Sequence, residues 1–254
     1  AFKIKAGIHY SPEYKINPID VPLLQQMSIT VQEPKYLGGA VKTVKNKGSL
    51  KVPEGSKITW DFKTEHTSSF LFFHNSDTHD LSKSPQLSFR ASASQSYQLE
   101  LKNKQTSKPT IFEHDIEVIK DEYPAITIKQ MADSIIPGTY LFTGQITDDY
   151  GLSKLSFHYS INDSNLIHPI PIDVSLSSQR YATEINFLQL GLAAGEQIQY
   201  FFEVSDNDGI NGPKSSFTNK LTFEVPGKKS IDSLLNKESD ELKNLMANAM
   251  SKSQ

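Results

Sequence analysis

The sequence predicts an all-β protein made of two tandem immunoglobulin-like β-sandwiches followed by a short C-terminal α-helix. Three observations lead to this prediction. Apolar and polar residues alternate with a period of two in short runs, rich in β-branched and aromatic residues, that Gly, Pro, Asn, Asp and Ser separate. The chain has 254 residues, enough for about two domains of 100–150 residues. Seven of the runs fall within about 100 residues of the second half, the number typical of an immunoglobulin-like sandwich.

Residues 1–20 contain one short strand pattern, FKIKAG, and we expect them to be the end of an upstream repeat or a leading strand. The first sandwich is predicted over residues 21–120. Its strands are expected at 25–33, 49–64, 68–75, 86–92, 96–103 and 110–120. Trp60 is the only Trp and lies in mid-strand, so we interpret it as a core anchor.

The boundary between the two domains is predicted in IKDEYPAI, residues 119–126. Tyr123 must stay extended because it precedes Pro124, so this segment is expected to be a short, stiff linker. The second sandwich is predicted over residues 121–226. Its strands are expected at 125–129, 139–147, 153–161, 166–172, 180–187, 197–205 and 216–225. Tyr200 follows a turn at the start of the sixth of these strands. This placement resembles a tyrosine corner, in which the hydroxyl bonds back to the upstream turn.

Residues 227–254 change to helical spacing, with Ser230 as a helix N-cap. We expect an amphipathic helix that begins a longer helical tail. Such a helix cannot bury its apolar stripe alone, so it is the expected site of self-association or of contact with a partner. The predicted interaction residues are Leu235, Leu242, Leu245 and Met246.

Composition excludes some classes of function. The net charge is −3, so a nucleic-acid partner is not expected. No apolar run reaches the roughly 18 residues that span a bilayer, so any membrane anchor is expected outside this segment. The chain has no Cys, which excludes disulfides and thiol catalysis but leaves the compartment open.

The chain contains, in order, the motifs VQEPKYLGG, SLKVPEGSKITW, VIKDEYPAITI, TDDYGLSKLSFHYSI and YFFEVSDNDGINGPKSS, then FEVP and a predicted helix. In this order they resemble a family of large membrane-anchored envelope proteins of Bacteroidetes that is classed as a domain of unknown function. The resemblance implies tandem immunoglobulin-like repeats before a helical tail. It also implies a location in the periplasm, as part of a protein anchored in the inner membrane. It carries no assigned activity and no catalytic residues.

No catalytic motif was found: the sequence has no G-x-S-x-G, phosphate-binding glycine loop, H-E-x-x-H or dinucleotide fingerprint. We therefore expect no enzymatic activity. The richest histidine region contains His66, His74, Asp77, His79 and Asp80. Zinc ligands are usually spaced more compactly, so we interpret these residues as a solvated loop.

Two acidic loops are the candidate metal site. In a seven-strand sandwich the second–third and sixth–seventh strand connections lie at the same end. Four carboxylates should therefore be neighbours, those of Asp148, Asp149, Asp206 and Asp208. Calcium is the ion that would suit them, although the second loop departs from the EF-hand pattern. The alternative is that the Asp side chains bond to their own turns while Lys154 and Lys214 neutralise the charge.

The expected function is a non-enzymatic spacer or docking module of a larger envelope protein. The alternative is a glycan-binding module, because β-sandwiches often bind glycans through exposed aromatic rings. The candidate tyrosines are Tyr10, Tyr14, Tyr36 and Tyr97.

Overall fold

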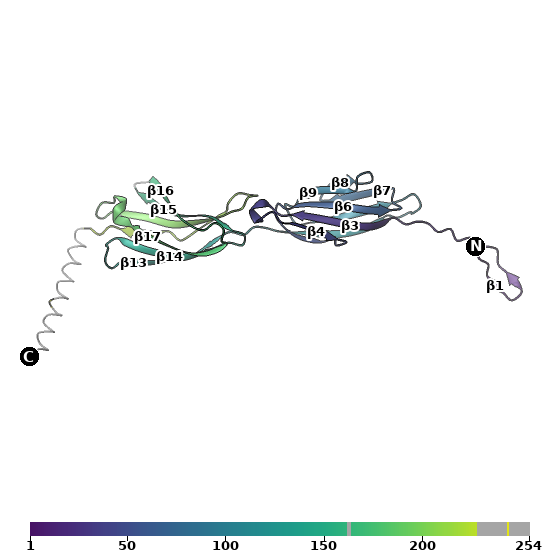
Figure 1. The fold of residues 1–254 in the computed structure, drawn as a ribbon, viewed down its shortest axis with the longest axis horizontal. Helices are drawn as coiled ribbons and strands as arrows, with labels where there is room; N and C mark the ends of the chain where they lie inside the picture. The colour runs from purple at the N-terminus through teal and green to yellow at the C-terminus, as the bar shows by residue number, and fades with distance from the viewer. Residues whose placement is uncertain (162–163, 228–242, 244–254) are drawn as a thin grey trace, which may run out of the picture. The chain divides into compact units, whose positions relative to one another are not determined.

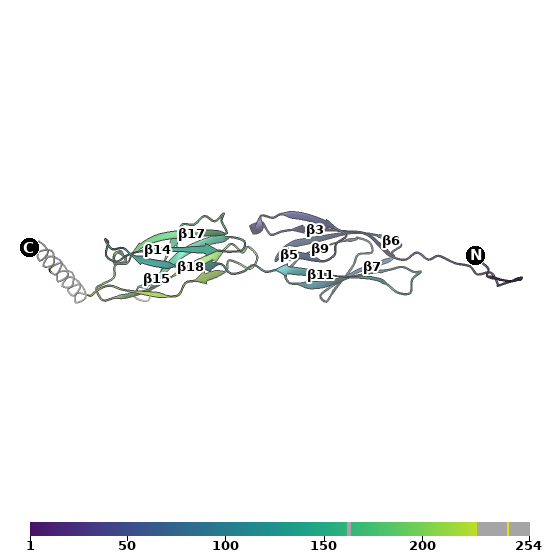
Figure 2. The same cartoon turned by 90° about the horizontal axis from the view of Figure 1, so that it is seen from below.

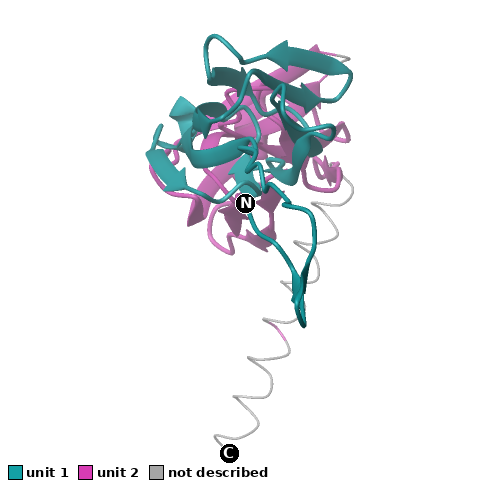
Figure 3. Ribbon diagram, turned by 90° about the vertical axis from the view of Figure 1, so that its right-hand side faces the viewer, with its two compact units in different colours: residues 1–121 teal, residues 122–254 magenta. Residues whose placement is uncertain are grey.

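A computed structural model of the protein describes residues 1–161, 164–227 and 243. The chain divides into two compact units, Ala1–Asp121 and Glu122–Gln254 (Figure 3). Each unit has its own hydrophobic core between two β-sheets.

A small hairpin precedes the first sandwich. Strands β1 (Lys5–Ala6) and β2 (His9–Tyr10) form a two-stranded sheet, and a further bridge joins Phe2 to Tyr14. All four residues of the two strands are exposed. The structure therefore has a fifth sheet besides the four that make up the two sandwiches.

Unit 1 packs a sheet of order β4-β3-β6-β9 against a sheet of order β5-β11-β10-β7-β8. The strands are β3 (Leu23–Gln32), β4 (Val41–Lys45), β5 (Leu50–Pro53), β6 (Lys57–Glu65), β7 (Ser69–His74), β8 (Asp77–Asp80), β9 (Gln86–Arg90), β10 (Gln95–Lys102) and β11 (Thr110–Ile119), with a 3-10 helix η1 (Lys35–Leu37) after β3. Strand β5 runs parallel to β11, and the other pairs are antiparallel. Figure 1 shows β3 beside β6.

The core of unit 1 follows from the period-two alternation. Along β6, Ile58, Trp60 and Phe62 point inward and are buried, while the residues between them are more exposed. Trp60 is fully buried and its Nε1 donates to the hydroxyl of Tyr97 at 3.4 Å. The prediction that Trp60 anchors the core is confirmed.

Unit 2 packs a sheet of β12, β14, β13 and β17 against a sheet of order β16-β15-β18, which β19 and β20 extend (Figure 2). The strands are β12 (Ala125–Ile126), β13 (Lys129–Ala132), β14 (Thr139–Thr147), β15 (Leu152–Ile161), β16 (Ser164–Ile170), β17 (Ser178–Asn186), β18 (Gln197–Asp206), β19 (Ser215–Phe217) and β20 (Leu221–Glu224), with a 3-10 helix η2 (Phe187–Leu190). The first, second and fifth strands share one sheet and the third, fourth, sixth and seventh share the other. This is the two-sheet architecture of an immunoglobulin-like sandwich, except that the fourth strand pairs with the third and not with the fifth. This count treats β12 and β13 as one interrupted strand, the first, and β19 and β20 as another, the seventh.

Aromatic rings fill the core of unit 2. Phe142, Phe157 and Phe202 are buried, and the Phe142 and Phe202 ring centroids lie 5.1 Å apart. Tyr200 is also buried, but its hydroxyl donates to Oε1 of Gln130 on β13 at 2.8 Å. The tyrosine-corner prediction is therefore wrong, because Tyr200 bonds to a side chain of the facing sheet and not to the upstream turn.

The predicted fold class is right in being all-β and wrong in adding a C-terminal α-helix. Within the described residues the elements are strands and two 3-10 helices; of the predicted helix only Lys243 is described, and this one α-helical residue does not make an element. Residues 228–242 and 244–254, on which the helix was expected, lie outside the described residues. In the part of the chain that the structure describes, no helix has the length and apolar character needed to cross a membrane.

Candidate functional site

The outer face of the β16-β15-β18 sheet carries a row of apolar and aromatic side chains. In the strand register, His158 on β15 lies between Ile167 on β16 and Phe201 on β18. The His158 and Phe201 rings are stacked, with centroids 4.8 Å apart and planes 11° from parallel. The side chains alternate along each strand, so these three residues point away from the core that Phe157 and Phe202 fill.

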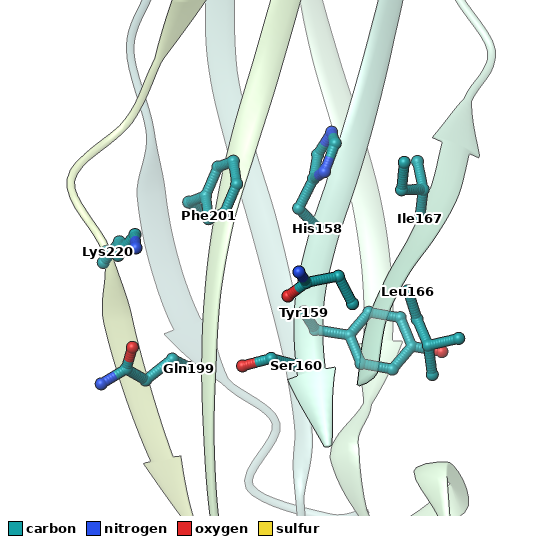
Figure 4. Close-up of a pocket in the computed structure, with 9 residues that line it drawn as sticks. His158, Tyr159, Ser160, Leu166, Ile167, Gln199, Phe201 and Lys220 are labelled. Carbon is teal, nitrogen blue, oxygen red and sulfur yellow. The ribbon is translucent and has the colours of Figure 1, made fainter. Parts of the chain in front are cut away.

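A second row, one step further along the same strands, is polar. Ser160 lies opposite Asn165 on one side and opposite Gln199 on the other. The two rows, together with Lys220, line an open groove of about 300 Å³ (Figure 4). We call this site the His158 groove; it is lined by His158, Tyr159, Ser160, Asn165, Leu166, Ile167, Gln199, Phe201 and Lys220.

Two ionisable features lie at the His158 groove: the contact between His158 and Glu203, and the ammonium of Lys220. Nε2 of His158 lies 2.7 Å from Oε2 of Glu203, and both side chains are largely buried. The ammonium of Lys220 lies over the Phe201 ring, 5.9 Å from its centroid. Next to the groove, Phe217 is 58% exposed and packs edge-on against Phe201. The groove therefore combines an accessible apolar surface with a positive charge. Sequence reasoning missed the groove, because cross-strand register cannot be read from one strand.

The two acidic loops of unit 2 lie side by side. The N–H of Asn207, after β18, donates to the carbonyl of Gly151, before β15, at 3.1 Å. A Cβ on Gly151 would lie 2.6 Å from Nδ2 of Asn207, so a larger residue here would have to displace the Asn207 side chain.

Within the second loop, a lysine lies between two carboxylates. Nζ of Lys214 is 2.9 Å from Oδ2 of Asp206 and 3.0 Å from Oδ2 of Asp208. Asp206 and Asp208 are buried, and each also accepts backbone N–H bonds within the loop. Burial of Asp208 opposes its ionisation, but the hydrogen bonds from Ile210, Lys214 and Asn211 outweigh it and hold the pKa of the Asp208 carboxyl below its usual value.

The remaining two acidic residues behave differently. Oδ2 of Asp148 accepts from the N–H groups of Tyr150 and Gly151, at 3.0 and 2.7 Å, and Asp149 is exposed. Burial raises the pKa of the Asp148 carboxyl, and the nearby charges of Asp149 and Asp206 act in the same direction. These contacts are those of the turn-forming alternative, with Lys214 as the cation. The calcium site at Asp148, Asp149, Asp206 and Asp208 stays a prediction.

The four candidate tyrosines belong to unit 1, whereas the groove belongs to unit 2. Tyr97 is buried and donates to the carbonyl of Gly48 at 2.8 Å, and burial raises its pKa to about 12. Tyr10 and Tyr14 are exposed near the N-terminal hairpin, and Tyr36 lies in η1. The four predicted interaction residues of the tail fall outside the described residues, namely Leu235, Leu242, Leu245 and Met246.

Residues 28–221 match the family described as Domain of unknown function (DUF4175). This range begins in β3 and ends in β20, so the match includes most of both sandwiches. No match was found among curated proteins.

Solved structures resemble the chain only distantly. The fibronectin(III)-like modules of Clostridium thermocellum CbhA match with 12% identity and a TM-score of 0.27, covering 72% of this chain and 93% of that one. A putative carbohydrate binding protein from Bacteroides uniformis matches with 9% identity and a TM-score of 0.27, covering 63% and 89%. Titin Ig tandem domains A164-A165 match with 10% identity and a TM-score of 0.23, covering 81% and 100%. Likeness this weak says nothing about function, and the description of the fold rests on the strand order above.

Proposed function

Because the chain belongs to the family described as Domain of unknown function (DUF4175), we propose that it is a non-catalytic tandem module that docks a protein partner. The observation that carries this proposal is the His158 groove on the outer face of unit 2. Both sandwiches fill their interiors with side chains, which leaves their outer faces and loops as the surfaces open to a ligand.

The chemistry of the groove defines the kind of partner. Ile167 is 64% exposed, so a partner that covers it gains free energy from burying apolar surface. Lys220 supplies a cation at the same place, whereas Glu203 is already in contact with His158. We therefore propose a partner surface that presents an apolar side chain to Ile167 and a carboxylate to Lys220.

The setting is proposed from the motif resemblance. It favours a spacer in a larger envelope protein of Bacteroidetes, with this segment in the periplasm and the anchor in the inner membrane outside it. The N-terminal hairpin supports a repeat architecture. Two-stranded hairpins are marginally stable alone, and this one exposes Ile8 to 87%. We propose that these residues complete an upstream repeat.

Site-specific photo-crosslinking tests the docking function. A photoreactive residue is placed at Ile167, in the groove, or at Glu184, on the exposed face of β17 in the other sheet, and expressed in the native host. The expected result is one recurrent envelope protein crosslinked from position 167 and not from position 184. The purified partner should then bind the chain, and Ile167→Asp and Lys220→Glu should each weaken binding by about tenfold, which corresponds to 1.4 kcal/mol.

Equal crosslinking from both positions, or unchanged affinity in both variants, would contradict docking at the groove. Catalytic turnover of any substrate by the purified chain would contradict the non-catalytic assignment as a whole.

The polar row favours glycan binding as the second candidate. Asn165, Ser160 and Gln199 place hydrogen-bonding groups beside an aromatic ring, a combination that suits a sugar. The Phe201 ring, however, already stacks on His158 and lies under Lys220, which leaves less ring surface for a sugar. A glycan array decides between the candidates: a defined glycan whose binding is lost in Gln199→Ala would favour this one.

A further inference from the structure

The β7–β8 hairpin of unit 1 brings two histidines and an aspartate together on one face. His74 ends β7 and lies directly opposite Asp77, which begins β8 after the two-residue turn Asn75–Ser76. His79 lies two residues beyond Asp77 and therefore points to the same side of the strand. The turn fixes this register, with Asn75 at a φ of +49°.

The ligand atoms of this trio are close enough to share one ion. One nitrogen or carboxylate oxygen from each of His74, Asp77 and His79 lies within 4.8 Å of the other two. The Nε2 atoms of His74 and His79 are 3.1 Å apart and share a hydrogen bond, whose proton an ion would replace. Two nitrogens bound to a tetrahedral zinc at 2.0–2.1 Å are separated by about 3.3 Å. The histidine pair therefore already has nearly the spacing that such an ion requires.

The two imidazole rings are held in place by packing. His74 stacks on Phe89 of the facing sheet, with centroids 4.5 Å apart and planes 14° from parallel, and it stacks on His79 with centroids 5.1 Å apart. The edge of Phe72 closes a further side of the His74 ring. Little side-chain entropy remains to be lost on binding, which favours a preorganised site. Asp77 is exposed and His79 half-buried, so an ion can enter from solvent.

We propose that His74, Asp77 and His79 bind a divalent first-row transition-metal ion, with Zn²⁺ as the reference ion. Two imidazole nitrogens and one carboxylate oxygen suit this class of ion, whereas calcium and magnesium prefer oxygen ligands alone. Three protein ligands leave the fourth tetrahedral position to water or to a group from outside the chain. The ion would join the edge strand β8 to β7 and brace the hairpin.

The other two residues of this region take no part. His66 lies with its Nδ1 3.6 Å from a carboxylate oxygen of Asp20. Asp80 accepts hydrogen bonds from the backbone N–H and the hydroxyl of Ser82, which lower the pKa of the Asp80 carboxyl. The site therefore consists of three of the five residues that the histidine-rich stretch offers.

Calorimetric titration of the whole chain with ZnCl₂ tests the site. Binding of one equivalent is expected, together with a higher melting temperature that a chelator reverses. His79→Gln and Asp77→Asn should each weaken binding by at least the 10–100-fold that loss of a mere outer-shell partner costs. His168→Gln is the matched control, because His168 also lies on an edge strand, and the zinc affinity of this variant should equal that of the wild type.

Nitrogen NMR of the imidazole rings identifies the ligands directly. Zinc should shift the Nε2 resonances of His74 and His79 and leave His158 unchanged, while circular dichroism checks that each variant is folded. If zinc shows no saturable binding at concentrations up to about 1 mM, the proposal is overturned, because a Kd of 1 mM corresponds to a binding free energy of only about 4 kcal/mol. An unchanged affinity in folded His79→Gln would also overturn it. The His158 groove lies in the other unit, so failure of the docking proposal would not affect this result.

Discussion

At the scale of single residues, the buried charges of the β18–β19 loop are the most sensitive feature of unit 2. Asp206 is fully buried and Asp208 nearly so, and both depend on the Lys214 ammonium. A buried carboxylate without a partner is far less stable than one in water. The loop can therefore keep its structure only while a cation stays between the two groups.

Lys214→Met is expected to destabilise unit 2 by about 3–5 kcal/mol, the usual cost of removing one partner of a buried ion pair. Urea unfolding measures the change. Lys154→Met, at an exposed position of β15, serves as the control and should stay within about 0.5 kcal/mol of the wild type. A loss in Lys214→Met no larger than in the control would mean that the ion pairs contribute nothing.

The same loop decides the calcium prediction. The Lys214 ammonium already occupies the position between the Asp206 and Asp208 carboxylates, so calcium should leave the melting temperature of the wild type unchanged. It should restore part of the stability lost in Lys214→Met, because the ion can then take the place of the ammonium. Saturable binding of calcium by the wild type that Asp206→Ala and Asp148→Ala both abolish would instead establish a calcium site.

Asp148→Asn should be at least as stable as the wild type at pH 7. The pKa of Asp148 is raised in the folded chain, so folding favours its protonated form. Stability is lost as the pH rises above the unfolded value of 3.8 and the carboxyl ionises. Asn keeps an oxygen acceptor for Tyr150 and Gly151 but carries no charge. Its advantage should vanish near pH 3, where Asp148 is neutral as well.

Thermal melts of the wild type and Asp148→Asn between pH 3 and pH 7 test whether the variant is the more stable protein at pH 7. Asp149→Asn, at an exposed position, reports the effect of removing one surface charge. If Asp148→Asn loses stability at pH 7 relative to this control, the ionised carboxylate contributes favourably and the predicted direction is wrong.

At the scale of elements, strands with a buried face were predicted closely, whereas two short exposed strands at sheet edges were missed. The run expected at 139–147 matches β14 residue for residue, and the runs at 153–161 and 197–205 match β15 and β18 to within one residue. Strands β4 and β8 were missed. Both lie at sheet edges, and β8 has the wholly polar sequence DTHD, so neither shows the alternation that burial imposes.

The missed strand also explains why this histidine-rich stretch was interpreted as a solvated loop. An unrecognised β8 gives no register that would place Asp77 opposite His74, with His79 on the same face. The His158 groove was overlooked for a similar reason, since its rows cross three strands. Sequence spacing within one strand predicts a face, whereas neighbours across a sheet require the register.

Gly144→Ala tests a close approach within one sheet. A Cβ at this position of β14 would lie 1.9 Å from the carbonyl oxygen of Thr127, a backbone atom that cannot rotate away. Thr127 is itself tied to Gln145 by backbone and hydroxyl bonds. The substitution should cost at least the 1–3 kcal/mol typical of overpacking. Gly227→Ala, with open space around it, is the matched control. Equal urea midpoints in the two variants would contradict the clash.

At the scale of the whole molecule, the two hydrophobic cores share no residues, and the only Trp belongs to unit 1. Fluorescence of Trp60 therefore reports the unfolding of unit 1, whereas circular dichroism reports both units. Phe202→Ala in unit 2 should cost about 3–5 kcal/mol. The midpoint of one unfolding transition followed by circular dichroism should fall, while the midpoint followed by Trp60 fluorescence should stay unchanged. Phe72→Ala, an equally buried ring in unit 1, should shift both signals. If Phe202→Ala shifts the Trp60 transition as far as Phe72→Ala does, the two sandwiches unfold as one cooperative body and the module cannot be treated as two independent domains.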